Sequence, residues 1–421
     1  MSALGWQNGL APGHTRTGDG MLAIGGMRAD ELAADFGTPA LILDLHALDR
    51  ALHELLAACG RHGIRASYAG KALLVTRLAR HLAARDIGID VASLGELVTA
   101  ERGGFEPARI TLHGAGKTED ELRAALAGRA GRIVVDSLDE LRRLEAIGPS
   151  GSCDLLLRLN TGIEAHTHEF VRTAGDHSKF GIAPHEEAAA LALLAAMPHL
   201  RVRGVHAHIG SQILDPEPFV ANATILAAAV ARMRERGFPA RVAVIGGGFG
   251  VPMHPEHEAS LDVGATIDAL AAAADGVELE IEPGRAIVAA AGTSLYRVMA
   301  IKRYERRTFV VVDGGMADNP RPALYDATHH AVAVKATNAP HQAVTLCGRS
   351  CENDELGSAA LPADLAPGDL IAVCTTGAYT YSMASNYNRF PRPPIVAVER
   401  GSAQLFARRE TLDDILRADL D

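Results

Sequence analysis

The chain has few aromatic residues, few cysteines and no excess of positive charge. Aromatic residues make up 4% of its 421 residues, and there are five cysteines. Five cysteines in a chain of this length do not form a disulfide framework, so we expect a reducing, cytoplasmic location. Lys and Arg total 41 against 51 Asp and Glu, which gives a net charge of -10. This acidic balance disfavours a nucleic-acid-binding protein, which usually has a basic balance.

Long apolar runs are missing as well. The longest uninterrupted one covers residues 188–197 and ends at Pro198. A membrane span needs roughly 18 or more apolar residues, so we expect no membrane association. Residues 1–20 are polar and Gly-rich, without the apolar core of a signal peptide, and we therefore predict none. The share of hydrophobic residues, 48%, is typical of a globular protein.

Strand and helix patterns alternate regularly from residue 65 onward. Each short apolar strand is followed by a helical pattern, and Ala-rich helices separate the later strands. The predicted strands are 65–69, 87–92, 109–113, 132–136, 154–159, 203–209, 241–245 and 278–282. Eight such units favour a closed (β/α)8 barrel of the TIM type over residues 40–295, because about 250 residues is typical of that fold. A doubly wound open sheet is the alternative.

The pattern changes after about residue 295. Short β-type runs separated by turn clusters replace the long helical patterns. The predicted strands are 294–300, 308–312, 331–335, 343–347, 370–374, 394–398 and 403–407. This pattern is typical of an all-β domain. We predict a C-terminal β-sandwich or β-barrel domain made of residues 296–421 together with the N-terminal segment, residues 1–39.

Lys71 follows one predicted barrel strand and Glu282 ends another, at the ends where barrel enzymes place catalytic groups. A lysine held among apolar residues at the barrel mouth can lose its proton and form a Schiff base. A solvated lysine is the alternative interpretation. Glu282 and Arg285 bring a carboxylate and a guanidinium to the end of the eighth strand, where structural ion pairing is the alternative.

His206 and His208 alternate along a strand, so both imidazoles are expected on one face. Such a pair can bind a metal ion, but no third ligand with suitable spacing is evident. Stacking of His208 over a planar cofactor, or a role as a core histidine, is the alternative. The glycines of residues 246–250 follow a strand, and their amides could cradle a phosphate. A plain tight turn is the alternative there, and Val251 excludes the dinucleotide fingerprint.

Three further positions could carry chemistry. Cys351 and Glu352 lie side by side in the β region, where a free buried thiol is the alternative. Tyr379 follows a strand-like run and could equally be a packed core residue. Residues 114–118 end like a Walker A loop, but the motif needs a glycine at Thr111, so ATP binding is not predicted.

Taken together, these segments resemble the fold-type III pyridoxal-phosphate-dependent amino-acid decarboxylases. The resemblance spans about residues 40–410. Its motifs are YAGKA (68–72), EAHTHEF (164–170), KFGI (179–182), HAHIGSQI (206–213), GGGFG (246–250), EPGRAI (282–287), VDGGMADNPRPALY (312–325), CEND (351–354) and TGAYTYSMASNYN (376–388). The second and seventh of these motifs are similar to those of the subgroup that acts on diaminopimelate.

The resemblance implies pyridoxal phosphate as the cofactor, held by Lys71 through a Schiff base. It places Glu282 beside the pyridine nitrogen and His208 against the ring face, and it makes Cys351 the proton donor. The residues that it implies for the phosphate are Ser211, Gly247, Gly248 and the backbone of Gly284 and Arg285. It implies no metal ion.

For the substrate, the resemblance implies Arg285 and Arg321 as partners of a distal carboxylate and Glu352 as the partner of a distal ammonium. Tyr325 and Tyr379 match positions that contact substrate or cofactor. The implied reaction is decarboxylation of meso-2,6-diaminopimelate to L-lysine and CO2. The family's active sites lie at the interface of a homodimer, to which the partner contributes the Cys-Glu segment.

Two segments differ from the family pattern. The family's HGNNK is HGAGK here (113–117), and its Cys-Glu-Ser-Gly-Asp is CENDE (351–355). These differences concern the substrate more than the cofactor. Two alternatives therefore stay open: a decarboxylase of the same fold that acts on another amino acid in a specialised pathway, and a non-catalytic homologue that only binds pyridoxal phosphate.

Overall fold

The computed structural model describes residues 6–7, 9–148, 153–163, 178–256 and 261–420. The motif EAHTHEF (164–170) lies outside these described residues. Contacts divide the chain into two compact units. The first, here the β unit, takes residues 1–52, 251–260 and 285–421, and the second, the barrel unit, takes residues 53–250 and 261–284.

The barrel unit is built on eight parallel strands that close into a ring in the order β10-β11-β12-β5-β6-β7-β8-β9. The strands are β5 (Arg65–Ala69), β6 (Gly88–Val91), β7 (Ile110–Leu112), β8 (Arg132–Val135), β9 (Asp154–Arg158), β10 (Arg201–His206), β11 (Val242–Val244) and β12 (Glu278–Ile281). The ring closes where β12 pairs with β5, with Ile281 opposite Ala66. The predicted (β/α)8 barrel is confirmed, and the open-sheet alternative is wrong.

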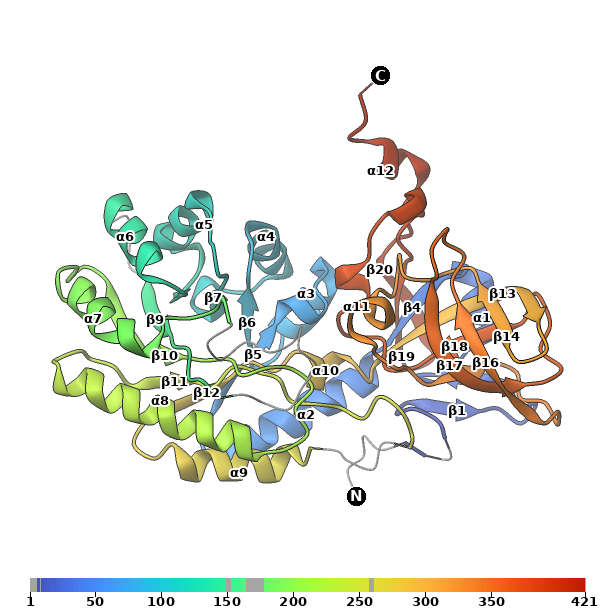
Figure 1. Cartoon of the computed structure of the whole chain (residues 1–421), viewed down its shortest axis with the longest axis horizontal. Coiled ribbons are helices and arrows are strands. Elements are labelled where there is room, and N and C mark those ends of the chain that lie inside the picture. Colours follow the sequence, from blue (N-terminus) through green and yellow to red (C-terminus); the bar gives the residue numbers. More distant parts are fainter. Residues whose placement is uncertain (1–5, 8, 149–152, 164–177, 257–260, 421) are drawn as a thin grey trace. The chain divides into compact units, whose positions relative to one another are not determined.

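Helices follow the barrel strands and lie outside the ring (Figure 1). They are α3 (Thr76–Ala83), α4 (Leu94–Gly103), α5 (Glu119–Ala124), α6 (Leu138–Ile147), α7 (Glu187–Ala195), α8 (Glu217–Glu235) and α9 (Val263–Ala273). Strands of a parallel barrel are covered on both faces, so many of their residues are buried. Strand β7, for example, is buried along its whole length.

Polar N-caps begin four of these helices. The side chains of Ser93, Thr118, Ser137 and Asp262 each accept a hydrogen bond from the backbone N–H three residues later. Each cap satisfies an amide that the helix itself leaves unpaired. Three of these caps, Ser93, Thr118 and Ser137, stand close behind a barrel strand, so they fix the turns at the end where the candidate site lies. Among the described helices, none combines the length and apolar character needed to cross a membrane.

The β unit holds a nine-stranded mixed sheet with the path β17-β16-β14-β13-β4-β19-β20, while β18 pairs with β13 and β15. Its strands are β4 (Ala40–Asp44), β13 (Gly292–Arg303), β14 (Thr308–Val312), β15 (Ala331–Ala333), β16 (His341–Cys347), β17 (Glu355–Pro362), β18 (Leu370–Val373), β19 (Ile395–Glu399) and β20 (Ser402–Ala407). A second, three-stranded sheet is formed by β1 (His14–Arg16), β2 (Leu22–Ile24) and β3 (Met27–Arg28).

The remaining helices and turns of the two units are α1 (Ala29–Phe36), α2 (Leu45–Gly60), α10 (Arg285–Val288), α11 (Arg321–Tyr325), α12 (Leu412–Leu416), η1 (Gly70–Ala72), η2 (Pro107–Arg109), η3 (Ala125–Arg129), η5 (Pro184–Glu186), η6 (Tyr381–Met383) and η7 (Tyr387–Arg389).

Two details of the β unit differ from the sequence prediction. Strand β4 falls in the range predicted for the barrel, 40–295, but it pairs with β13 and β19 in the nine-stranded sheet. Strand β17 was not predicted, because its sequence ELGSAALP has no β-branched or aromatic residue. Its seven-residue pairing with β16 forms it nonetheless, which shows tertiary context overriding weak propensity.

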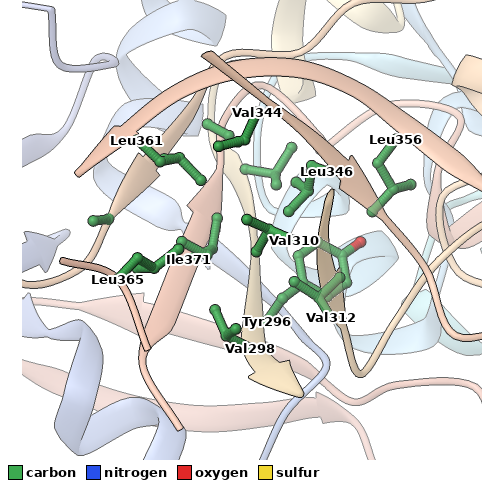
Figure 2. Close-up of a cluster of buried hydrophobic side chains, with 13 residues drawn as sticks. Tyr296, Val298, Val310, Val312, Val344, Leu346, Leu356, Leu361, Leu365 and Ile371 are labelled. Atoms are coloured by element: carbon green, nitrogen blue, oxygen red, sulfur yellow. The ribbon is translucent and has the colours of Figure 1, made fainter. Parts of the chain in front are cut away.

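Two apolar clusters stabilise the β unit. Figure 2 shows the larger one, in which Tyr296, Val310, Leu346 and Ile371 from different strands point toward one another. In the second cluster, Leu22 of the N-terminal sheet is buried with residues of β4 and β19. The predicted inclusion of the N-terminal segment in this domain therefore agrees with the packing.

Candidate active site

Lys71 stands in the turn η1, directly after β5. The Tyr68 hydroxyl donates to the carbonyl of Leu73 at 2.8 Å and so ties this turn back to the strand. The lysine side chain is exposed, whereas the sequence predicted it among apolar residues. An exposed amine at a strand end is still accessible to an incoming carbonyl compound, which a nucleophilic lysine requires.

Glu282 follows β12 and is buried against two imidazoles of the same unit. His206 Nε2 lies 2.9 Å from Glu282 Oε2, and His113 Nε2 lies 3.2 Å from Glu282 Oε1. Burial by itself favours the neutral acid, but the two imidazoles outweigh it and hold the pKa of Glu282 well below its usual range. The carboxylate is therefore ionised, which suits a partner for a protonated ring nitrogen.

His208 follows β10 and is half-buried. The Gly247 amide donates to its Nδ1 at 3.3 Å. Burial, reinforced by the charge of Lys71, holds the pKa of His208 well below its usual range. The imidazole is therefore neutral, with its proton on Nε2, and it presents a flat ring rather than a charge.

The histidine pair predicted from the HAH motif does not act as a pair. His206 contacts Glu282, whereas His208 accepts from the Gly247 amide. In the described part of the chain, the ligand-type atoms that converge are those of His113, His206 and Glu282, within 4.8 Å of one another. These groups contact each other directly, as an ion-paired cluster does.

The glycine loop 246–250 packs against two neighbouring loops of the barrel unit. Gly246 and Gly248 have positive φ angles of 73° and 104°. A Cβ on Gly247 would stand 2.1 Å from the carbonyl oxygen of Glu282. The Ile213 amide donates to the Gly248 carbonyl at 3.0 Å, which brings the loop of Ser211 alongside. Side-chain-free backbone of this kind can surround a phosphate.

The barrel unit thus offers groups that match the parts of pyridoxal phosphate. It has an amine for the aldehyde, a neutral imidazole for the ring face, an ionised carboxylate for the ring nitrogen, and glycine loops for the phosphate. The glycines let these loops pack closely on one another, because a Cβ on Gly247 or Gly248 would meet the carbonyl oxygen of Glu282 or of Gly210. The residues present therefore fit this cofactor.

The β unit holds two buried arginines beside aromatic rings. The Cζ atoms of Arg285 and Arg321 lie 4.9 Å and 5.7 Å from the centroid of the Tyr379 ring, and Arg321 lies 5.3 Å from that of Tyr325. The Nε of Arg321 is buried with no hydrogen-bond partner among the described residues. Burial and the charge of Arg285 lower the pKa of Arg321 to about 10. Two like charges buried together favour the arrival of an anion.

Cys351 and Glu352 lie in an exposed bend of the β unit. The Cys351 amide donates to Asn388 Oδ1 at 3.1 Å, and the Tyr387 hydroxyl donates to Glu352 Oε1. The alternative of a buried, inert thiol is therefore wrong for Cys351. The bend is anchored at its end by Asp354, whose Oδ1 accepts from the Met316 amide at 2.7 Å.

Two residues of the cluster around Glu282 were missed by the sequence analysis. Asp90, in β6, is buried, and His113 follows β7. A charged residue inside an apolar strand, and a histidine at a strand end, were the available signals. Lys117, in the same loop as His113, is fully buried and donates to Glu140 Oε1 at 2.7 Å and to the Val134 carbonyl at 2.6 Å. These contacts hold Lys117 inside the barrel unit.

Comparison with known proteins identifies the class that this fold and site define. Residues 45–289 match the family of pyridoxal-dependent decarboxylases, over its pyridoxal-binding domain. The chain is 40% identical to diaminopimelate decarboxylase of Actinosynnema pretiosum subsp. auranticum, with 98% of this chain and 96% of the relative covered. The crystal structure of diaminopimelate decarboxylase from M. jannaschii superposes with a TM-score of 0.89 at 30% identity, covering 97% of this chain and 98% of that one.

The enzyme from Helicobacter pylori, solved in complex with L-lysine, has a TM-score of 0.86 and 31% identity over 92% of this chain and 98% of its own. The chain belongs to the diaminopimelate decarboxylase family. The predicted family, fold class and pyridoxal phosphate cofactor are thereby confirmed.

Proposed function

We propose that the protein converts meso-2,6-diaminopimelate to L-lysine and CO2. The observation that carries the proposal is the buried pair of Arg285 and Arg321 beside Tyr379. Guanidinium groups bind carboxylates in bidentate fashion, and a diamino diacid has a second carboxylate that such a pair would hold. Lysine has no such group, so the product would be bound more weakly than the substrate.

In the proposed mechanism Lys71 would hold the cofactor covalently through its amine. When bound, pyridoxal phosphate supplies an electron-poor ring that accepts the electron pair left as the α-carboxylate departs as CO2. The ionised Glu282 would accept the N–H of the ring nitrogen, and His208 would support the ring face. The phosphate would be held by Ser211, Gly247, Gly248, Gly284 and the backbone of Arg285.

The last step adds a proton to the α-carbon of the substrate in place of the departed carboxylate, and we assign this proton to the Cys351 thiol. Glu352 binds the distal ammonium, and Tyr325 lines the substrate beside Arg321. The bend that carries Cys351 and Glu352 is exposed in the single chain. This exposure supports a homodimer in which the bend serves the active site of the partner, because a catalytic acid works best out of bulk water.

A decarboxylation assay tests the substrate. The enzyme loaded with pyridoxal phosphate is given meso-diaminopimelate, L-lysine, L-ornithine or L-arginine, and CO2 release is measured. We expect meso-diaminopimelate to have the highest kcat/KM by about 10-fold or more, since the other three lack a distal carboxylate. A higher kcat/KM for one of the other amino acids would favour another substrate. No CO2 from any of them would favour a non-catalytic role.

Replacing Arg321 by alanine should raise KM for meso-diaminopimelate and leave cofactor binding unchanged. A lost hydrogen bond to a charged group costs roughly 1.5–3 kcal/mol, or about 10- to 150-fold in KM. Steady-state kinetics and cofactor absorbance measure the two effects. Arg307→Ala is the control, because Arg307 also lies over an aromatic ring, 4.7 Å from the centroid of Phe309. Loss of cofactor with an unchanged KM would assign Arg321 to the cofactor instead.

A further inference from the structure

Four ionisable side chains of the barrel unit meet where four strands end. We call Asp90, His113, His206 and Glu282 the carboxylate–imidazole cluster. Asp90 is in β6, His206 ends β10, and His113 and Glu282 directly follow β7 and β12. The proposed function uses Glu282 alone, so it leaves the other three without a role.

His113 occupies the centre of this cluster. Its Nε2 lies 3.2 Å from Glu282 Oε1 and 3.7 Å from Asp90 Oδ1, and its ring centroid lies 5.1 Å from that of His206. The backbone fixes this position, because the His113 amide donates to the Val91 carbonyl at 2.7 Å. The buried ammonium of Lys117 also holds the loop by donating to the Gly114 carbonyl at 2.9 Å.

Asp90 favours a positive charge in the cluster. Its side chain is buried, and neither of its oxygens has a hydrogen-bond donor among the described residues. A second carboxylate, Glu282, is buried in the same cluster. Two buried carboxylates repel each other unless a positive group stands between them, and His113 is the group that contacts both.

We propose that His113 is a positioning residue whose imidazolium keeps Glu282 ionised and so directs the shared proton onto the ring nitrogen of the cofactor. The inference rests on the proposed role of Glu282. The imidazolium directly contacts Glu282, whereas the ring nitrogen would lie beyond that carboxylate. The nearer interaction is the stronger one, so the charge of His113 lowers the proton affinity of Glu282 more than that of the nitrogen.

The electrostatics of the surrounding groups support this assignment. Burial by itself would lower the pKa of His113, but Glu282 and Asp90 raise it to about 9. Burial and the charge of Glu282 raise the pKa of Asp90 to about 7, and burial lowers that of His206 to about 4. At neutral pH His113 is therefore protonated, His206 is neutral and Glu282 is ionised, while Asp90 is near the midpoint of its own titration. Other charged groups that act on it are Glu96, Arg132 and Arg158.

The test measures whether the ring nitrogen of the cofactor is protonated. Holoenzyme is prepared with pyridoxal phosphate labelled with 15N in the ring, and the 15N NMR shift is recorded from pH 6 to pH 9.5. In the wild type we expect the protonated nitrogen up to about pH 9, where His113 loses its proton. In His113→Gln the midpoint should fall by about one pH unit or more, which is a tenfold change in the proton equilibrium.

Two variants complete the design. His62→Gln breaks an exposed imidazole–carboxylate contact, 2.7 Å from Asp268, and should titrate like the wild type. Glu282→Gln should lower the nitrogen midpoint whether or not His113 matters. An unchanged midpoint in His113→Gln with a lowered one in Glu282→Gln would overturn the inference and leave the proposed function standing. Unchanged midpoints in both variants would overturn the role of Glu282 as well.

A second measurement uses the wild-type chain, so it does not depend on whether the His113→Gln variant folds. The wild-type chain is labelled with 15N-histidine, and the His113 side chain is followed by NMR through the same pH range. An imidazolium at pH 7.5 is expected, with deprotonation near pH 9. A neutral His113 at pH 7.5 would overturn the inference, whatever the effect of the substitution.

Discussion

Replacing Lys71 by alanine should yield a folded protein that retains no pyridoxal phosphate covalently and has no detectable activity. The chain contains only five lysines. Of the other two in the barrel unit, Lys117 is fully buried against Glu140, and Lys179 lies 5.1 Å from the centroid of the Phe180 ring. Lys71 is the one that stands at a barrel strand end among the groups that fit the cofactor, and only an amine can bind its aldehyde.

Borohydride reduction followed by peptide mass mapping checks this expectation. The wild type should carry one reduced adduct, on the peptide that contains Lys71, and the variant should carry none. Lys179→Ala serves as the control and should keep both the adduct and the visible absorbance of the bound cofactor. An adduct on Lys117 or Lys179 of the wild type would contradict the assignment.

Replacing Cys351 by alanine should leave cofactor loading intact and slow turnover about 10²- to 10⁴-fold, the usual contribution of a general acid. A serine at this position should recover little, because a hydroxyl is a far weaker acid than a thiol. Cys347→Ala is the matched control. That thiol is half-buried, and burial raises its pKa to about 11, so its removal should leave kcat unchanged. Equal losses in both variants would point to a structural effect.

Mixing the two inactive variants tests whether the site is shared between subunits. In a hybrid dimer of Lys71→Ala and Cys351→Ala chains, one of the two sites would contain both intact groups. Random exchange should then restore up to about a quarter of the wild-type sites. If subunits exchange, as a tagged pull-down would show, and no activity returns, the two residues act within one chain or one of them has no catalytic role.

The barrel could be predicted from the sequence because its signal is local and repeated. Each strand is a short apolar run followed by a helix, and polar caps such as Ser93 and Ser137 stand at the junctions. Strand β17 could not be predicted, because its small residues form a strand only through pairing with β16. The sequence also could not show which sheet contains β4, since an apolar strand of five residues fits the barrel and the nine-stranded sheet equally well.

Some residues of the candidate site could likewise be predicted from the sequence, and others could not. Lys71, His208 and Glu282 could be predicted as candidates because each belongs to a recognisable motif at a strand end. Asp90 and His113 were missed, because their contact joins the ends of two different strands and no spacing along the chain reveals it. The clustering of Arg285 and Arg321 around one tyrosine ring is likewise a property of the folded β unit.

The anchor behind Cys351 limits how this enzyme can be re-engineered. A Cβ at Gly315 or at Gly348 would stand 2.2 Å from Asp354 Oδ2, and the Gly348 amide donates to the Asp354 carbonyl at 2.7 Å. The base of the bend therefore has no room for a side chain at Gly315 or Gly348. Libraries aimed at new substrates are best confined to the exposed positions Glu352 and Asn353, where changed side chains leave the frame of the thiol in place.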